Sequence, residues 1–164
     1  MNFKIRPAAK DDCKEISRMI LELAVYENMS DQVKISHEEL ERDGFCENPF
    51  FECLIAEVPE EHKSKDGFTI VGYALYFYTY STWKGRSVYL EDLYVMPEFR
   101  GNGIGKGLLS SVAQGKRSSV YGCSCLCSTG ILPLETSTLL KELRTSPSAR
   151  AGTLYDLTDK TWTI

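Results

Sequence analysis

The sequence predicts an α/β fold in which helices flank a mixed β-sheet. Two observations support this fold class. Strand-type and helix-type patterns follow one another over residues 3–114 in the order strand, helix, helix, strand, strand, strand, helix. A glycine-rich turn joins the last of these strands to the last helix. With 164 residues, the chain is long enough for one domain with a single hydrophobic core.

The pattern begins with one strand and one helix. Residues 3–6 alternate as a short strand, and Pro7 closes it. Apolar residues then recur at helical spacing over residues 13–23. Asp11 or Asp12 is the expected N-cap of this helix, because a short acidic side chain can accept a hydrogen bond from the first turn.

A second helix and three strands follow. Ser36 and Glu39 have capping-box spacing, and Gly44 lies where the second helix is expected to end. The strands are expected over residues 51–58, 68–80 and 88–95, with a charged hairpin loop over residues 59–67. Leu108, Leu109 and Val112 then start the last helix just after the glycines.

The composition is that of an ordinary globular protein, with 43% hydrophobic and 26% charged residues. The net charge of -4 argues against nucleic acid and anionic membranes as main partners, and mildly favours a cationic ligand. No stretch approaches the apolar length of a membrane span. The six cysteines show neither zinc-type pairing nor a secreted disulfide framework, so we predict no metal site and a reduced, cytoplasmic protein.

The glycine-rich turn carries the strongest chemical signal. Gly101, Gly103 and Gly105 let the backbone turn tightly and direct N–H groups toward one point, where a helix N-terminus adds partial positive charge. This favours a phosphate or pyrophosphate ligand. The turn is neither a P-loop, which needs GxxxxGK[ST], nor a GxGxxG fingerprint early in a βαβ unit. The alternative is a tight strand-to-helix connection without a ligand.

These motifs resemble a known family. The order Arg100-x-x-Gly103-x-Gly105 is similar to the acetyl-CoA pyrophosphate loop of the GCN5-related N-acetyltransferases. Residues 1–114 resemble the diamine acetyltransferases, the spermidine/spermine N1-acetyltransferase branch of that superfamily. The matching segments include IRPA at 5–8, ELAVYE at 22–27, NPFFECLIAEVP at 48–59, VGYALYF at 71–77 and YLEDLYVMPEFRGNGIG at 89–105. DQVKIS at 31–36 and STWKGR at 81–86 lean toward the thialysine N-epsilon-acetyltransferase type.

The resemblance implies acetyl-CoA as cofactor and assigns residues to its binding. Backbone groups of the strand are expected to hold the pantetheine arm as an added peptide strand would be held, and the turn is expected to hold the pyrophosphate. The expected cofactor-binding residues are Leu93, Tyr94, Val95, Arg100, Gly101, Asn102, Gly103, Ile104, Gly105 and Lys106. A strand splay, as the family has, would also aim one N–H at the thioester oxygen. Ordinary packing of the strand side chains in the core is compatible with these roles.

Acetyl transfer to an amine needs a base, because an alkylammonium with a pKa near 10.4 is almost fully protonated at pH 7. Glu91 is the best candidate and matches the family's proposed base. Adjacent acids on a regular strand point to opposite faces, so at most one of Glu91 and Asp92 is expected to face a given cleft. The alternative is that both are solvated strand residues. Tyr26 and Glu27 match the family's substrate-binding loop, although a surface position at a helix end is equally compatible with them.

The amino-acid composition changes after Gln114. Residues 115–164 hold 15 Ser and Thr, against 11 in the first 114, and all seven Phe precede residue 100. The family's last 50 or so residues have no counterpart here, including the Tyr that protonates the leaving thiolate. Neither Tyr121 nor Tyr155 lies in a matching context. Read one base early, the back-translated codons permit the family's missing motifs at the family's spacing, so we infer that residues 115–164 are an out-of-frame tail, from alternative splicing or a sequence error.

The sequence therefore predicts an acetyltransferase domain over residues 1–114 and a divergent tail over residues 115–164. The fold is expected to be truncated or disordered after the fourth strand and its following helix. The predicted function is acetyl-CoA-dependent transfer of acetyl to a primary amine of a small diamine, polyamine or thialysine-like substrate. The alternative is a catalytically inactive isoform that binds acyl-CoA weakly or pairs with an intact subunit. A small cationic amine and, by resemblance, a second copy in a homodimer are the expected partners.

Overall fold

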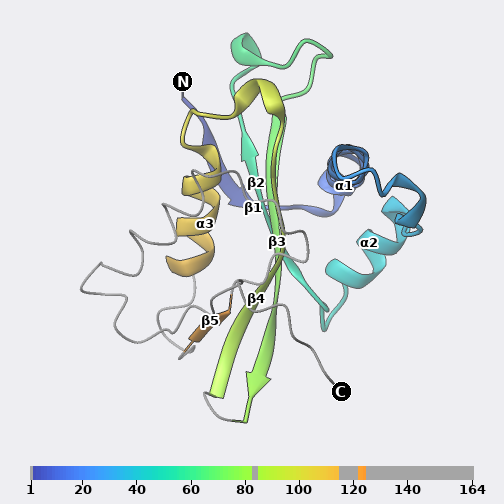
Figure 1. Ribbon diagram of the computed structural model, residues 1–164, viewed down its shortest axis with the longest axis vertical. Coiled ribbons are helices and arrows are strands. Elements are labelled where there is room, and N and C mark those ends of the chain that lie inside the picture. Colours follow the sequence, from blue (N-terminus) through green and yellow to red (C-terminus); the bar gives the residue numbers. More distant parts are fainter. Residues whose placement is uncertain (1, 83–84, 115–121, 125–164) are drawn as a thin grey trace.

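A single β-sheet with helices on both faces forms the protein (Figure 1). The computed structural model describes residues 2–82, 85–114 and 122–124. Figure 1 shows the sheet edge-on, with α3 (Ile104–Gln114) against one face and α1 (Cys13–Tyr26) and α2 (His37–Gly44) on the other. The predicted α/β class with a mixed sheet is confirmed.

The strands lie in the sheet in the order in which they occur in the chain. They are β1 Lys4–Pro7, β2 Glu52–Glu57, β3 Ile70–Ser81, β4 Gly85–Val95 and β5 Gly122–Ser124. The first four pair antiparallel, and β5 pairs parallel to β4. From the sequence we expected the fold to be truncated or disordered after the fourth strand and its following helix. The short strand β5 instead continues the sheet beyond β4. The other residues of the predicted tail lie outside the described ranges.

Short 3₁₀ turns occupy four of the connections, and one of them corrects a sequence prediction. These turns are η1 Lys10–Asp12, η2 Ser30–Gln32, η3 Glu60–His62 and η4 Pro97–Phe99. Asp12 does not cap α1 through its side chain. Its carboxylate instead accepts from the backbone N–H of Ala9 at 2.7 Å and pairs with the guanidinium of Arg6 on β1 at 2.7 Å. The acid therefore ties the start of α1 to the sheet edge.

The second helix begins and ends as predicted. The Ser36 hydroxyl accepts from the N–H of Glu39, and the Glu39 carboxylate accepts in turn from the N–H of Ser36. The two bonds satisfy donors that have no acceptor within the helix. Gly44 ends α2, and its missing side chain leaves room for the ring of Phe51, because a Cβ there would lie 2.5 Å from the ring.

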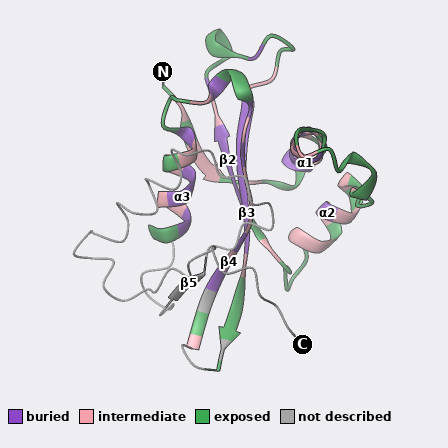
Figure 2. Ribbon diagram, viewed as in Figure 1, coloured by how far each residue is buried: buried purple, intermediate pink, exposed green. Residues whose placement is uncertain are grey.

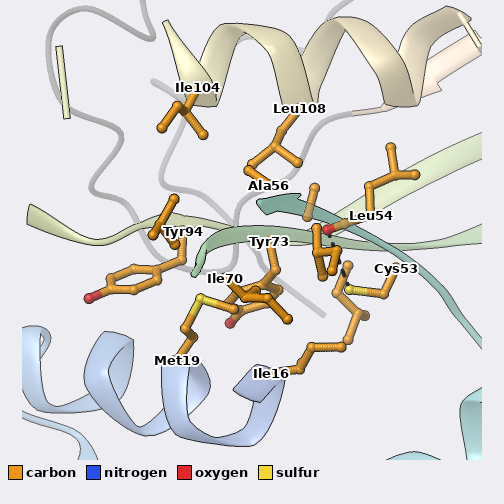
Figure 3. Close-up of a cluster of buried hydrophobic side chains, with 14 of the residues drawn as sticks. Ile16, Met19, Cys53, Leu54, Ala56, Ile70, Tyr73, Tyr94, Ile104 and Leu108 are labelled. Carbon is orange, nitrogen blue, oxygen red and sulfur yellow. Dashed lines mark hydrogen bonds between the residues drawn. The ribbon is translucent and has the colours of Figure 1, made fainter. Parts of the chain in front are cut away.

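The core lies on both faces of the sheet. Figure 3 shows Ile16 and Met19 of α1 on one side of the strands and Ile104 and Leu108 of α3 on the other. The side chain of Tyr73, at the centre of β3, is fully buried. Burial falls toward the distal end of β3 (Figure 2), where Tyr80 is 71% exposed. Within the described ranges, none of the helices combines the length and the hydropathy needed to span a bilayer.

Candidate active site

The glycine turn begins after η4 and leads into α3. Gly101 and Gly103 have φ values of +79° and +80°, a left-handed conformation that glycine adopts without the strain a side chain brings. A Cβ on either residue would meet no atom within 4 Å. The Asn102 side chain donates to the carbonyl of Phe99 at 3.1 Å and braces the turn. The turn therefore exposes its backbone to open space on the side where a ligand would approach.

Gly105 differs from the two glycines before it. Its φ is not positive, and a Cβ there would make only an ordinary contact, 3.8 Å from Val95 Cγ2. The fold alone therefore does not require glycine at this position. The first intrahelical bond runs from the N–H of Gly107 to the carbonyl of Gly103, so the N–H groups of Ile104 and Gly105 lie in the first turn and have no acceptor within the helix. A missing side chain beside such donors is what close approach of an anion needs.

The polar backbone groups of β4 reach the outer edge of the strand at alternate residues. The N–H of Met96 donates to the carbonyl of Val71 at 2.9 Å, which fixes the phase of the antiparallel ladder between β3 and β4. In this phase Leu93 and Val95 direct their N–H and C=O groups away from β3. Tyr94 directs its backbone toward β3, so it differs from the sequence prediction that all three residues offer backbone groups to a ligand.

The sequence places the pantetheine arm at this outer edge. β5 pairs with β4 only at Ser87, Val88 and Tyr89. Within the described residues, no strand lies beside Leu93 and Val95 on the side away from β3. An extended ligand chain can therefore pair with the N–H and C=O of Leu93 and with the N–H of Val95 as an added strand would, whereas the C=O of Val95 accepts from Arg100.

A β-bulge interrupts β4 at Glu91. Leu90 pairs with Tyr76 and Asp92 with Leu75, so Glu91 is an extra residue on β4. Because Tyr76 and Leu75 are neighbours on β3 and point to opposite faces, Leu90 and Asp92 also point to opposite faces although they are two residues apart. The sequence argument that strict alternation separates the two acids therefore fails at this position.

Asp92 was not among the site residues predicted from the sequence, yet its carboxylate has a raised pKa. Its pKa is raised to about 6, mainly by burial. The Tyr73 hydroxyl donates a hydrogen bond to Oδ2 at 3.2 Å, and this bond lowers the pKa in part. The negative charges of Glu91 and Glu27 raise the pKa further. The end of α1 and the bulge of β4 therefore bring three carboxylates into one electrostatic neighbourhood. Only the adjacency of Asp92 to Glu91 pointed to it in the sequence.

Tyr26 and Glu27, the predicted substrate residues, lie at the C-terminal end of α1. The Arg100 guanidinium of the turn lies 5.1 Å from the ring centre of Tyr26 and 5.8 Å from that of Tyr94. Its Nε donates to the carbonyl of Val95 at 2.9 Å. The structure therefore places a predicted substrate residue beside the predicted cofactor turn.

The side chain of Tyr94 belongs to the helical side of the site. Its hydroxyl donates to Glu22 Oε2 of α1 at 2.9 Å, and Arg18 pairs with the same carboxylate group. Burial and the Glu22 carboxylate raise the pKa of this hydroxyl well above its usual value. Tyr94 therefore stays neutral and anchors β4 to α1.

The two histidines of the chain are in other elements: His37 is at the start of α2, and His62 is an exposed residue of η3. Tyr121 and Tyr155 lie outside the described ranges, as does the segment in which the family's leaving-group acid was sought. In the part of the chain that the structure describes, no three His, Cys, Asp or Glu side chains are grouped as metal ligands.

Comparison with known proteins agrees with the sequence resemblance. Thialysine N-epsilon-acetyltransferase of Mus musculus is 55% identical over 111 residues, which are 68% of this chain and 65% of the mouse protein. Spermidine/spermine N(1)-acetyltransferase-like protein 1 of Homo sapiens is 47% identical over 124 residues, which are 76% of this chain and 17% of that protein. The chain thus aligns with about two thirds of the length of the thialysine acetyltransferase.

Solved structures share the fold at low identity. An aminoglycoside acetyltransferase from an uncultured soil metagenomic sample matches with a TM-score of 0.67 and 14% identity, over 100% of this chain and 99% of that one. A ribosomal-protein-alanine N-acetyltransferase from Brucella melitensis matches with a TM-score of 0.64 and 16% identity, over 99% and 98%.

The match to a family model decides the family. Residues 20–130 match the model of the acetyltransferase (GNAT) family. This range includes the end of α1, the bulge of β4 and the glycine turn, so it covers the whole candidate site. The chain therefore belongs to the GNAT family of acetyltransferases.

Proposed function

We propose that the chain is an acetyl-CoA-dependent N-acetyltransferase that acts on a primary amine of a small diamine, polyamine or thialysine-like substrate. The observation that carries this proposal is the acidic group formed by Glu91 and Asp92 on β4 and Glu27 at the end of α1, in which the charges of both glutamates raise the pKa of Asp92. Negative charge at this place attracts and orients a cationic amine. The names of the two relatives support the same substrate class. They give no support to the alternative of an inactive isoform.

The residues present fit acetyl-CoA, which supplies an acetyl group as a thioester. Leu93 presents a backbone donor and acceptor for the amide groups of a pantetheine arm, and Val95 presents its backbone donor, since its carbonyl accepts from Arg100. The turn from Arg100 to Lys106 provides the N–H groups, the helix N-terminus and the guanidinium for a pyrophosphate. The missing side chain at Gly105, which the fold itself does not require, is explained by this ligand.

We propose Glu91 as the general base. At pH 7 only about one alkylamine molecule in a few thousand is neutral, so forming the neutral amine costs roughly 4–5 kcal/mol. A carboxylate next to the ammonium, directly or through one water molecule, takes its proton and lowers that cost. Asp92 adds a second negative charge above about pH 6, which strengthens the field that holds the cation.

We propose that Tyr26 and Glu27 bind the distal part of the substrate. Both lie at the end of α1, and the charge of Glu27 reaches Asp92. A diamine or thialysine carries a second cationic group some distance from the reacting amine, so a carboxylate on a different element can select for it. Assembly as a homodimer, a cytoplasmic location and the division of the chain at residue 114 remain predictions of the sequence.

The proposal is tested with the purified 164-residue chain. Calorimetry with CoA measures binding at the turn, and mass spectrometry measures acetylation of thialysine and of spermidine by acetyl-CoA. We expect micromolar CoA binding and acetylation of at least one amine. A folded chain that binds no CoA would overturn the proposal. Binding without acetylation would favour the inactive alternative.

A further inference from the structure

Arg100 touches three parts of the site with one side chain. Its Nε donates to the Val95 carbonyl on the outer edge of β4. Its guanidinium lies over the ring of Tyr94 at 5.8 Å and over the ring of Tyr26 at 5.1 Å. The residue itself begins the glycine turn. The predicted pantetheine edge, pyrophosphate turn and substrate residue therefore meet at a single cation.

The ring of Tyr94 is much more buried than the ring of Tyr26. Tyr94 is 4% exposed, and its hydroxyl is bonded to Glu22. Tyr26 is 51% exposed at the last position of α1. It is followed within two residues by Asn28, whose φ of 58° is unusual for a residue with a side chain. Tyr94 is therefore a fixed support for the guanidinium, whereas the position of Tyr26 depends on the contacts that it makes at the surface.

The neighbours of Tyr26 confirm that this end of α1 has little burial to hold it. Val25 is 63% exposed and Met29 is 51% exposed. Backbone bonds from Asn28 to Val25 and from Met29 to Ala24 close the helix end, but they leave about half of the Tyr26 side chain exposed. A contact worth a fraction of a kcal/mol can therefore shift the population of Tyr26 positions.

From these contacts we propose that Arg100 is a positioning residue that couples the cofactor turn to the amine site through Tyr26. This inference rests on the proposed function. A diphosphate in the turn pairs with the guanidinium and restricts its motion against Tyr94. The restricted guanidinium then holds the Tyr26 ring, and with it Glu27, in the arrangement that receives the amine. Coupling between two binding sites is reciprocal, so the amine also strengthens binding of the cofactor by the same factor.

The coupling is measured by calorimetry with CoA and thialysine, a pair that binds without reacting. The dissociation constant of CoA is determined alone and with saturating thialysine, for the natural chain, for Tyr26→Leu and for Tyr26→Phe. We expect thialysine to tighten CoA binding about two- to fivefold in the natural chain, the range that one cation–π contact gives at an exposed site. Tyr26→Leu should bring this factor close to one, and Tyr26→Phe, which keeps the ring, should preserve it.

The outcomes separate this inference from the proposed function. No binding of CoA by the folded natural chain would contradict the function itself. Binding of both ligands with a coupling factor of one would leave the function standing and overturn the coupling. An unchanged factor in Tyr26→Leu, with thialysine binding weakened, would show that Tyr26 is a substrate contact alone. Loss of the factor in Arg100→Lys, which keeps the charge but not the planar guanidinium, would support the role given to Arg100.

Discussion

At the scale of residues, the largely buried carboxylate of Asp92 lowers the stability of the fold above its pKa. Its pKa is about 6 in the folded chain against an ordinary value of 3.8. Between these two pH values the folded chain binds more protons than the unfolded chain, so the free energy of unfolding falls as the pH rises through this window. Above about pH 6 the full loss is reached, and it is on the order of 3 kcal/mol.

Asp92→Asn should therefore stabilise the fold at neutral pH while reducing activity. The amide cannot ionise and still offers an oxygen to the Tyr73 hydroxyl, so we expect a gain of about 1–3 kcal/mol at pH 7.5. The gain should disappear by about pH 3, below both pKa values, where the natural carboxyl is protonated in both states. Urea unfolding at several pH values measures this, with Asp11→Asn as an exposed control. A gain that does not change with pH would show that packing is its cause.

Glu91→Gln tests the base. We expect kcat/KM for acetylation of an amine to fall by about 10²–10⁴ at neutral pH, because the ammonium loses its proton acceptor. The loss should shrink as the pH approaches the pKa of the amine, where free amine is already abundant. Rates over pH 6.5–9.5 provide the measurement. A loss of equal size at every pH would assign Glu91 a structural role.

At the scale of elements, the start of α3 offers two glycines that separate ligand binding from folding. Gly105→Ala meets no close atom and improves the helix, so we expect a stability gain of about 0.5–1 kcal/mol together with at least tenfold weaker CoA binding. Gly107→Ala is the matched control. Its Cβ would lie 2.7 Å from Ile5 Cδ1, so the stability should be lower than in Gly105→Ala while CoA binding stays the same. Thermal unfolding and calorimetry give both quantities.

An opposite result at Gly105 is easy to recognise. If Gly105→Ala binds CoA as tightly as the natural chain does, the first turn of α3 does not approach an anion closely. The pyrophosphate assignment would then be lost even in a chain that retains activity.

The sequence predicted the elements whose ends are marked by local residue chemistry. The capping box at Ser36, the end of α2 at Gly44 and the strand-turn-helix around Gly103 follow from local residue chemistry. The predicted strand did not include the bulge at Glu91, although an inserted residue shifts the phase of a period-two pattern: the apolar residues change from even positions, Val88 and Leu90, to odd positions, Leu93 and Val95. The sequence did not single out Asp92, because its neighbours Tyr73 and Glu27 come close to it only in the folded chain.

At the scale of the whole molecule, the outer edge of β4 is the part of the sheet that the described residues cover only in part. β5 covers only three residues of β4, and the rest of the residues after Gln114 lie outside the described ranges. The alignment with the mouse thialysine acetyltransferase leaves about a third of each chain unmatched, because it covers 68% of this chain and 65% of the relative. The interpretation of residues 115–164 as an out-of-frame tail remains a prediction.

A chain with the reading frame restored after residue 114 should be more stable and more active than the 164-residue chain. The restored strand and helix would bury several large apolar side chains, each worth about 1.5–3 kcal/mol, against a total stability of about 5–15 kcal/mol. Turnover of thialysine and unfolding in urea, measured side by side, test this expectation. Equal turnover by the two chains would show that the natural tail completes the site by itself.

The bulge of β4 has one more consequence, for the length of that strand. Without Glu91, Leu90 would join Asp92 directly, and the two side chains would still point to opposite faces, as neighbours on a regular strand do. The ladder with β3 would then be continuous, and all the other residues of β4 would keep their partners. A strand one residue shorter would thus serve the sheet equally well, and Glu91 is the residue of β4 that the architecture can spare.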